Sequence, residues 1–393
     1  MKLLKAKCSV LICCAFLFSV SCAAVASNNG EDYFPIQQDG KVGFIDKTGK
    51  IVITPQFDSA SSDEGRTFSE GLAAVKVGDK WGYIDKSGKF VIPPKFKQES
   101  APTLFYEGLA QVLIKETIIE KSGELDKSQK YIVREEILGF IDKSGEFVES
   151  LKFIEESTRF SEGLAKVSKG GKFGYVDKTG RFVIEARFAK AEDFKEGLAA
   201  VRMDVETKSD KGSMSLNSAG VAGESKYGFI DKTGKMVIKP QFNYAESFSE
   251  GLAAVSSEMG DQNGYIDKTG KVIIAPRFDQ TYPFSEGLAK VVIGGKAGFI
   301  DAKGRVVISL RFSEPEFGNS INYRGFKEGL AVVEVNNKSG YIDKTGKMII
   351  APQFDYGSDF NGGVASVNIG EPGNQKTYYI DKTGKVISAQ KIN

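Results

Sequence analysis

The chain has 393 residues, 41% of them hydrophobic, which is enough for a large folded body and excludes disorder throughout. Its 53 Lys and Arg balance 51 Asp and Glu, with the two signs interspersed and no basic stretch, so nucleic acid is not an expected partner. It contains no histidine, which excludes Ser-His-Asp and Cys-His catalytic sites and zinc sites with His ligands.

The first 26 residues have the features of a secretory signal peptide. Three lysines precede an apolar run from Val10 to Val20, and Ala24-Val25-Ala26 then supplies the small-x-small pattern of a cleavage site. We therefore predict cleavage between Ala26 and Ser27, which divides the chain into a signal peptide (1–26) and an exported body (27–393) in the periplasm or medium.

Two other readings of this segment remain open. Cys22 follows Ser19-Val20-Ser21, as the acylated cysteine of a membrane-anchored lipoprotein would, although the usual aliphatic residue three positions upstream is absent. A retained transmembrane anchor is weaker, because the apolar run is short of the roughly 20 residues that a span needs. Export is expected in each case, and after cleavage at Ser27 the chain would have no transmembrane span. It would also have no disulfide and no thiol nucleophile, because all four cysteines precede that point.

From residue 33 onward the chain is a series of repeats organised by a turn of the form Asp-Lys-Thr/Ser-Gly. The turns recur at intervals of 34 to 42 residues, except for two intervals of 54 and 57 residues. This period is typical of repeat arrays and propeller blades. The nine turns begin at Asp46, Asp85, Asp142, Asp177, Asp231, Asp267, Asp301, Asp343 and Asp381.

Each turn lies between two short runs rich in β-branched and aromatic residues, such as Val272–Ile274, so it predicts a hairpin. The Asp and Thr/Ser side chains can bond the local backbone, and Gly supplies the positive φ of a type I turn followed by a bulge. A third run lies upstream, as in Leu72–Val77. Each unit is therefore predicted to be a three-stranded antiparallel meander.

The units are joined by a connector of the form Phe-x-x-Ala-x-x-Phe-Ser-Glu-Gly-Leu-Ala, seen at Phe242–Ala253. Large apolar side chains at two fixed places are expected to form the core, because each unit needs an anchor against its neighbour. The first Phe recurs as Phe57, Phe96, Phe153, Phe188, Phe242, Phe278, Phe312 and Phe354, and the second as Phe68, Phe105, Phe160, Phe194, Phe248, Phe284, Phe326 and Phe360.

The motif Lys80-Trp81-Gly82-Tyr83-Ile84-Asp85, with Phe-Ser-Glu-Gly-Leu-Ala downstream, resembles that of the bacterial WG-repeat (KWG-repeat) proteins over residues 33–393. Only one copy keeps the Trp, and Val42, Phe173 or Ala297 stands there in others. The resemblance implies an all-β repeat of mostly unassigned function. We expect a tandem array of about nine antiparallel β-meanders. A propeller-like radial stack is preferred to an open superhelical β-stack, because the ends lack obviously polar caps.

Three insertions interrupt the repeat, at 115–138, 204–226 and 313–324. In the first, Thr117–Ile119 and Tyr131–Val133 could pair as an extended ribbon. The second is rich in Ser and Gly and poor in apolar residues, so we expect a mobile loop from Asp204 to Lys226.

No motif assigns a reaction. The pair Gly170-Gly171 fits a hairpin tip and lacks the spacing of a phosphate loop. The turn Asp is expected to bond turn amides, and a repeated Glu is expected to hold the connector turn or pair with a turn Lys, rather than to bind calcium or act as a catalytic acid. No cofactor, metal site or catalytic residue is predicted. The repeated glutamates are Glu70, Glu107, Glu162, Glu196, Glu250, Glu286 and Glu328.

These features favour an exported, non-enzymatic scaffold that binds a protein or glycan at the bacterial cell envelope. The alternative is a carbohydrate-active or other hydrolytic enzyme that uses unrepeated acids of an insertion, such as Glu135 and Glu136. A purely structural envelope protein is a third reading.

Overall fold

The chain divides into two units, Met1–Glu31 and Asp32–Asn393. A computed structural model describes residues 32–62, 66–97, 101–122, 130–153, 158–205, 224–256, 262–314, 325–370 and 376–390, all of them in the second unit. Cys22, Ala26 and Ser27, on which the export prediction depends, lie outside the described residues.

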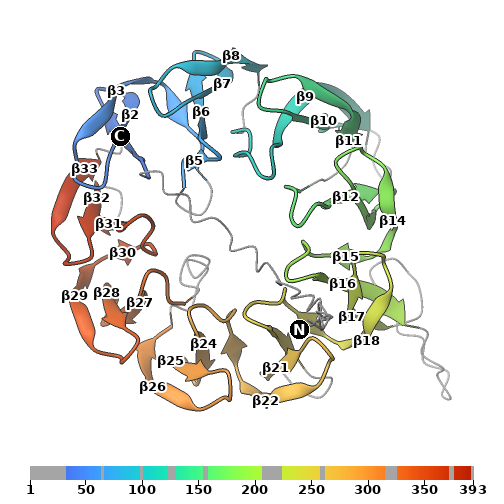
Figure 1. Cartoon of the computed structure of the whole chain (residues 1–393), viewed down its shortest axis with the longest axis vertical. Coiled ribbons are helices and arrows are strands. Elements are labelled where there is room, and N and C mark those ends of the chain that lie inside the picture. The colour runs from blue at the N-terminus through green and yellow to red at the C-terminus, as the bar shows by residue number, and fades with distance from the viewer. Residues whose placement is uncertain are drawn as a thin grey trace, which may run out of the picture. The chain divides into compact units, whose positions relative to one another are not determined.

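The described residues form strands and turns, with no helix among them, and the strands are arranged as nine three-stranded antiparallel meanders. The meanders succeed one another in chain order within the second unit (Figure 1). Their strands are β1–β3 (Phe34–Gln38, Lys41–Ile45, Ile51–Phe57), β6–β8 (Leu72–Val77, Lys80–Ile84, Phe90–Lys97), β9–β11 (Ala110–Ser122, Lys130–Ile141, Phe147–Phe153), β12–β14 (Ala165–Lys169, Lys172–Val176, Phe182–Phe188), β16–β18 (Leu198–Val205, Glu224–Asp231, Met236–Phe242), β20–β22 (Leu252–Ser256, Asn263–Asp267, Val272–Phe278), β24–β26 (Leu288–Ile293, Lys296–Asp301, Val306–Ser313), β27–β29 (Leu330–Val335, Lys338–Asp343, Met348–Phe354) and β31–β33 (Val364–Ile369, Lys376–Asp381, Val386–Gln390).

The connectors contribute short strands that the sequence analysis did not predict. Five of them pair with the first strand of the following meander, which adds a fourth strand to that meander. A sixth, β5, pairs with β6 through the connector turn itself. They are β4 (Ser59–Ala60), β5 (Phe68–Ser69), β15 (Lys190–Ala191), β19 (Tyr244–Ala245), β23 (Gln280–Thr281) and β30 (Tyr356–Gly357). The meanders β24–β26 and β27–β29 also share one seven-stranded sheet with β23, because Ser313 of β26 pairs with Glu334 of β27.

The glycine of the Trp-Gly motif is required by a close approach of two backbones. Between Trp81 and Tyr83 the pairing of β7 with β8 shifts register, as at a β-bulge. A Cβ built on Gly82 would lie 2.6 Å from the Ile92 carbonyl oxygen and 2.8 Å from the Pro94 nitrogen. No side chain fits there, and the position is glycine in eight of the nine meanders. The last meander has Tyr378 instead, which pairs in register with Ala389. Equivalent contacts are found at Gly43, Gly174, Gly228, Gly264, Gly298 and Gly340.

The predicted phenylalanine core is confirmed wherever the side chains are described; that of Phe153 is not. The other fifteen connector phenylalanines are buried, with exposed fractions of 0 to 9%. The second Phe packs on the Tyr or Phe of the middle strand, as where the Tyr265 and Phe284 rings lie 5.0 Å apart between centroids. One core cluster joins Phe229 of β17 to Ile266 of β21, so adjacent meanders share a core. A single unit therefore buries its apolar face only against a neighbour.

The first and last meanders contact each other through side chains. Among the described strands, none of the first meander pairs with one of the last. The Phe34 and Tyr379 rings lie 5.7 Å apart, and the Tyr379 hydroxyl donates a 2.7 Å hydrogen bond to the Pro35 carbonyl. In an internal unit the same tyrosine hydroxyl donates to the next connector, as Tyr265 does to the Tyr282 carbonyl. Closure as a propeller is still a prediction, because these contacts join the ends without a shared sheet.

The structure confirms one insertion prediction and corrects the bounds of another. β9 and β10 pair along an extended ribbon in which Ile119 lies opposite Val133, as predicted. The predicted loop 204–226 is too long, because Asp204 and Val205 belong to β16 and Glu224–Lys226 belong to β17, where these residues continue the ladder. The remainder of that loop lies outside the described residues, as do 315–324 of the third insertion.

Candidate binding surface

The connector glutamates occupy a strained backbone conformation that fixes their direction. Ser249 and Leu252 exchange backbone hydrogen bonds across Glu250-Gly251, which forms a two-residue hairpin turn. Glu250 has φ 52° and Gly251 φ 82°, values of a type I′ turn, in which Asn-Gly is the usual pair. A left-handed non-Gly residue costs about 1–2 kcal/mol. All seven glutamates share this conformation, with φ between 51° and 54°, so a compensating interaction is expected.

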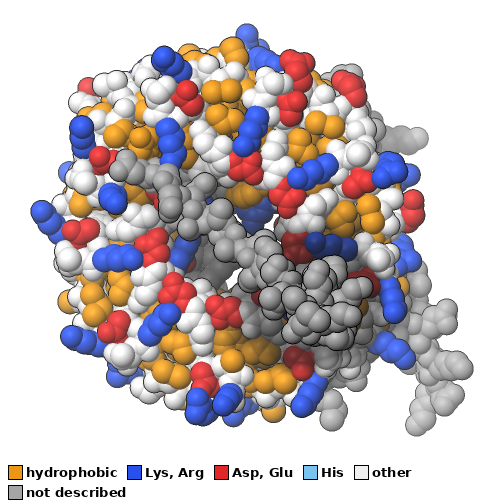
Figure 2. Space-filling model, in the orientation of Figure 1, with side chains coloured by type: hydrophobic (Ala, Val, Ile, Leu, Met, Phe, Trp, Pro, Cys, Tyr) orange, Lys and Arg blue, Asp and Glu red, His pale blue; other side chains and the backbone are white. Residues whose placement is uncertain are grey.

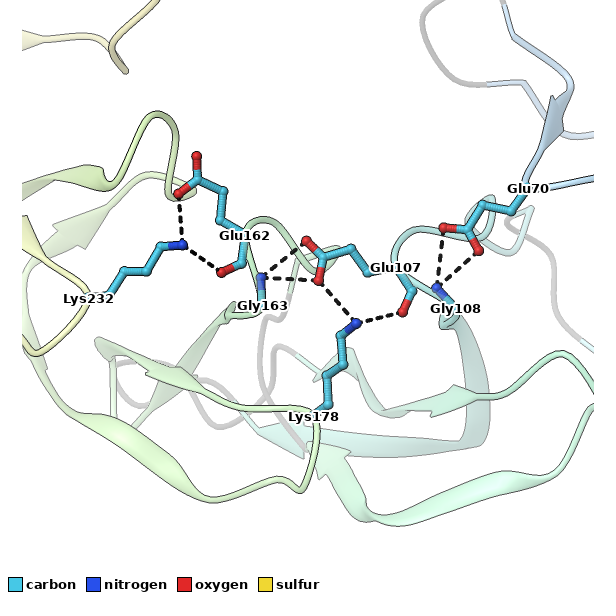
Figure 3. A network of polar contacts seen from close by, with 7 residues as sticks. All are labelled: Glu70, Glu107, Gly108, Glu162, Gly163, Lys178 and Lys232. Atoms are coloured by element: carbon cyan, nitrogen blue, oxygen red, sulfur yellow. Dashed lines mark hydrogen bonds and ion pairs between the residues drawn. The ribbon is translucent and has the colours of Figure 1, made fainter. Parts of the chain in front are cut away.

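The carboxylate of each connector glutamate supplies that interaction by accepting a hydrogen bond from the next connector. Figure 3 shows Glu107, whose two carboxylate oxygens each lie 3.1 Å from the Gly163 amide nitrogen. Asn at this position would form the turn but is too short to reach across the units. The other bonds run from Gly108 to Glu70, Gly197 to Glu162, Gly251 to Glu196, Gly287 to Glu250, Gly329 to Glu286, and both Gly362 and Gly363 to Glu328.

A turn lysine from two units further along the chain completes the contact. Lys178 donates to the Glu107 carbonyl at 2.8 Å, and its Nζ forms a 3.1 Å ion pair with the same carboxylate (Figure 3). These pairs are partly exposed, so each contributes only about 0–1 kcal/mol. The predicted pairing of repeated glutamates with turn lysines is therefore confirmed, and it links units that are distant in the sequence. The other pairs are Lys143–Glu70, Lys232–Glu162, Lys268–Glu196, Lys344–Glu286 and Lys382–Glu328.

These contacts, in which a connector glutamate binds the next connector and a turn lysine, form a network that departs from its pattern at two places. Ala302 stands where a lysine would face Glu250, and no ion pair reaches Glu250 from any described residue. Gly362 stands where the eighth glutamate would be, and the Asp32 side chain lies against it, so that a Cβ at Gly362 would collide with the Asp32 carboxylate. Gly362 keeps the positive φ of the turn, at 60°.

The turn aspartates are also structural, as predicted. The Asp177 carboxylate accepts hydrogen bonds from the Thr179 hydroxyl at 2.5 Å, the Thr179 amide at 2.8 Å and the Arg181 amide at 3.2 Å. These bonds, the hydroxyl first, lower the pKa of Asp177 to about 2. The pKa values of the other eight turn aspartates are lowered in the same way, with Arg305 as the main partner of Asp301. Such groups are poor proton donors near neutral pH.

The strongest exception to the repeat is a buried ion pair between Lys290 of β24 and Glu314, just after β26. Both side chains are 5% exposed, and Nζ lies 3.1 Å from each carboxylate oxygen. The Tyr282 hydroxyl donates to Glu314 at 2.6 Å, and Nζ lies 3.9 Å from the centroid of the Tyr282 ring. Burial lowers the pKa of Lys290, and Glu314 opposes that shift. The sequence pattern did not indicate this cluster, although Lys290 stands at a core position of its strand.

A cavity of about 20 Å³ adjoins the ion pair. It is lined by Phe299 and Phe312 together with Lys290, Glu314 and Glu334. Burial raises the pKa of Glu334, and the nearby charge of Glu314 adds to the rise. Such a volume holds about one water molecule. The cluster is therefore a buried polar anchor at the base of the third insertion.

Other candidates from the sequence gain no support as a site. Glu135 and Glu136 lie in β10, but their side chains are outside the described part of the chain. Within the described ranges, no three His, Cys, Asp or Glu residues are grouped so that they could hold a metal ion. In the same ranges no helix is long and apolar enough to cross a bilayer.

The face of the second unit shown in Figure 2 carries Lys and Arg side chains interspersed with Asp and Glu, as the sequence predicts. Hydrophobic side chains lie between them on this face. On this face the described atoms therefore present a mixed surface, without one continuous field of either sign.

Comparison with known proteins identifies the repeat. The family model described as "WG containing repeat" matches residues 43–81, 81–116, 139–173, 173–204, 227–258, 264–296, 298–338 and 340–371. No curated protein matches the chain. Among solved structures, apo AztD from Citrobacter koseri is similar over 92% of this chain and 94% of its own, with 12% identity and a TM-score of 0.39. Virginiamycin B lyase from Staphylococcus aureus is similar over 70% and 98%, with 13% identity and a TM-score of 0.32.

Proposed function

The chain belongs to the family built from the WG-containing repeat, and from this premise we propose that it is an exported, non-enzymatic scaffold that binds a protein or glycan partner at the bacterial cell envelope. The observation that supports this function is the use of the repeated acids. Each connector glutamate accepts a backbone amide hydrogen bond from the next unit, and each turn aspartate accepts amides of its own turn. The carboxylates of the repeat therefore stabilise its own turns and connectors. The segments that differ between units remain available to bind a partner.

In this proposal the partner binds to the segments that differ from the repeat. The β9–β10 ribbon extends the third meander beyond the length of the other hairpins. The insertion after Glu314 begins from a buried, charged anchor. Rigid support beneath a variable segment lowers the entropy that binding must overcome.

A hydrolytic enzyme is the alternative, and it has a direct test. The unrepeated acids Glu135 and Glu136 are the residues to change, each to Gln. The mature chain is expected to show no turnover on a panel of glycans and esters. Turnover that one of these changes abolishes would replace the scaffold with an enzyme.

Export is tested by mass spectrometry of the processed protein from its native cell. We expect an amino terminus at Ser27. An acylated Cys22 would instead make the protein a lipoprotein, and an intact Met1 would contradict export through a cleaved signal.

A further inference from the structure

We propose that Glu250 and the truncated side chain at Ala302 form a receptor for one primary ammonium group, which a lysine side chain of a protein partner occupies. The other copies of the network in this chain show what the site accepts. In five of them a lysine Nζ contacts both the carbonyl oxygen and the carboxylate of the glutamate, and in a sixth the ion pair alone is made.

The acceptors at Glu250 are held in the arrangement that the filled copies use. Its φ of 52° falls within the range of the other glutamates, 51° to 54°. Its carboxylate accepts the Gly287 amide at 2.9 Å, as Glu196 accepts the Gly251 amide at 3.0 Å. The carbonyl and carboxylate are therefore fixed without the lysine, so an incoming ammonium would need little rearrangement.

The turn that carries Ala302 in place of the lysine keeps the backbone conformation of the other turns. In the turn that begins at Asp301, the aspartate carboxylate still accepts the amides of Lys303 at 3.0 Å and Arg305 at 2.9 Å. The backbone thus places Ala302 where the other turns place lysine, and the chain ends at Cβ. Both Glu250 and Ala302 are exposed, so an external side chain can approach.

The filled copies also indicate the chemistry of the occupant. One carbonyl oxygen and one carboxylate oxygen converge on a point, which suits the compact ammonium of lysine and its three donors better than the planar fork of arginine. An exposed pair of this kind contributes only a few-fold to affinity. A free amine would therefore bind weakly, and the site acts as one contact within a larger interface with a protein.

The ammonium site can be tested without a native partner, so its failure is distinguishable from failure of the proposed binding function. The reporter is the Gly287 amide, observed by NMR in protein labelled with ¹⁵N-glycine. The probe is Nα-acetyl-lysine methylamide, titrated to about 0.5 M because exposed ion pairs are weak. Its Nε-acetylated form, which has no charge, is the matched control. A glycine methylamide arm distinguishes an α-ammonium source from a lysine side chain.

Three variants at exposed positions make the test decisive. We expect a progressive shift of the Gly287 amide in the wild-type protein with the lysine probe only, and its loss in Glu250→Gln and in Ala302→Lys, where the chain fills its own site. Lys268→Ala should create a second site, reported by the Gly251 amide bonded to Glu196. An equal shift in wild type and Glu250→Gln, or no new response in Lys268→Ala, would overturn the proposal.

Discussion

The buried ion pair gives the sharpest prediction about stability. Replacing Lys290 with Met removes the cation from a pair in which both side chains are 5% exposed. Of the described residues, only the Tyr282 hydroxyl would then still donate to the Glu314 carboxylate. Breaking a buried pair on one side costs about 3–5 kcal/mol, because the other charge is left without compensation. We expect Lys290→Met to lower the free energy of unfolding by that amount.

The measurement is equilibrium unfolding in urea, with two matched variants. In Lys290→Met/Glu314→Gln the neutral amide can still accept from Tyr282, so most of the lost stability should return and the double-mutant cycle should show strong coupling. Lys268→Met removes a lysine that is 44% exposed and pairs with Glu196, and should cost at most about 1 kcal/mol. Equal losses in Lys290→Met and Lys268→Met would refute the assignment of a buried, coupled pair.

Three further predictions test the core, the turns and the contact between the ends. Phe248→Ala, at a ring that is 1% exposed, should cost about 3–5 kcal/mol by urea unfolding while the far-UV circular dichroism stays that of a β protein; a neutral effect would contradict the shared core. The pKa of Asp177 falls from 3.8 to about 2 on folding, so its contribution is present above pH 3.8 and is lost as the pH drops toward 2; Asp177→Asn should therefore destabilise the protein at pH 6 and have little effect near pH 2. Tyr379→Phe should cost about 1 kcal/mol, as Tyr265→Phe should, if the ends pack like neighbouring units; a neutral Tyr379→Phe beside a costly Tyr265→Phe would mean an open array.

The periodic features of the fold were predictable because they repeat. Nine copies of one turn predicted the meanders, and short runs of β-branched residues between the turns identified the strands. Two recurring phenylalanine positions predicted the core. The short connector strands were missed, since two residues are too few to show a period. The positive φ of the connector glutamates was also missed, although Glu-Gly between Ser and Leu stands where a type I′ turn expects Asn-Gly.

The contacts between units were only partly predictable. A pairing of glutamate with a turn lysine was expected, but the partner lies two units away, a separation that no local pattern encodes. The pairing of Lys290 with Glu314 could not be predicted from the sequence, because it depends on the direction of the chain at the end of β26, where the third insertion begins. Ala302 departs from the turn motif in the sequence. Its consequence, a glutamate without a lysine partner, can be recognised only from the structure, where other turn lysines contact the glutamates.

The scaffold proposal is tested by capture of a partner from the envelope fraction of the native cell, with the mature chain as bait. The variant for comparison removes 117–134, 206–223 and 315–324 together, which spares the paired residues of β16 and β17 as well as Glu314. Asp267→Asn serves as the control for a repeated acid. We predict that the partner captured by the wild-type chain is also captured by Asp267→Asn and is lost from the deletion variant. Capture that survives the deletion, or a turnover activity that disappears on changing one acid, would contradict a display scaffold.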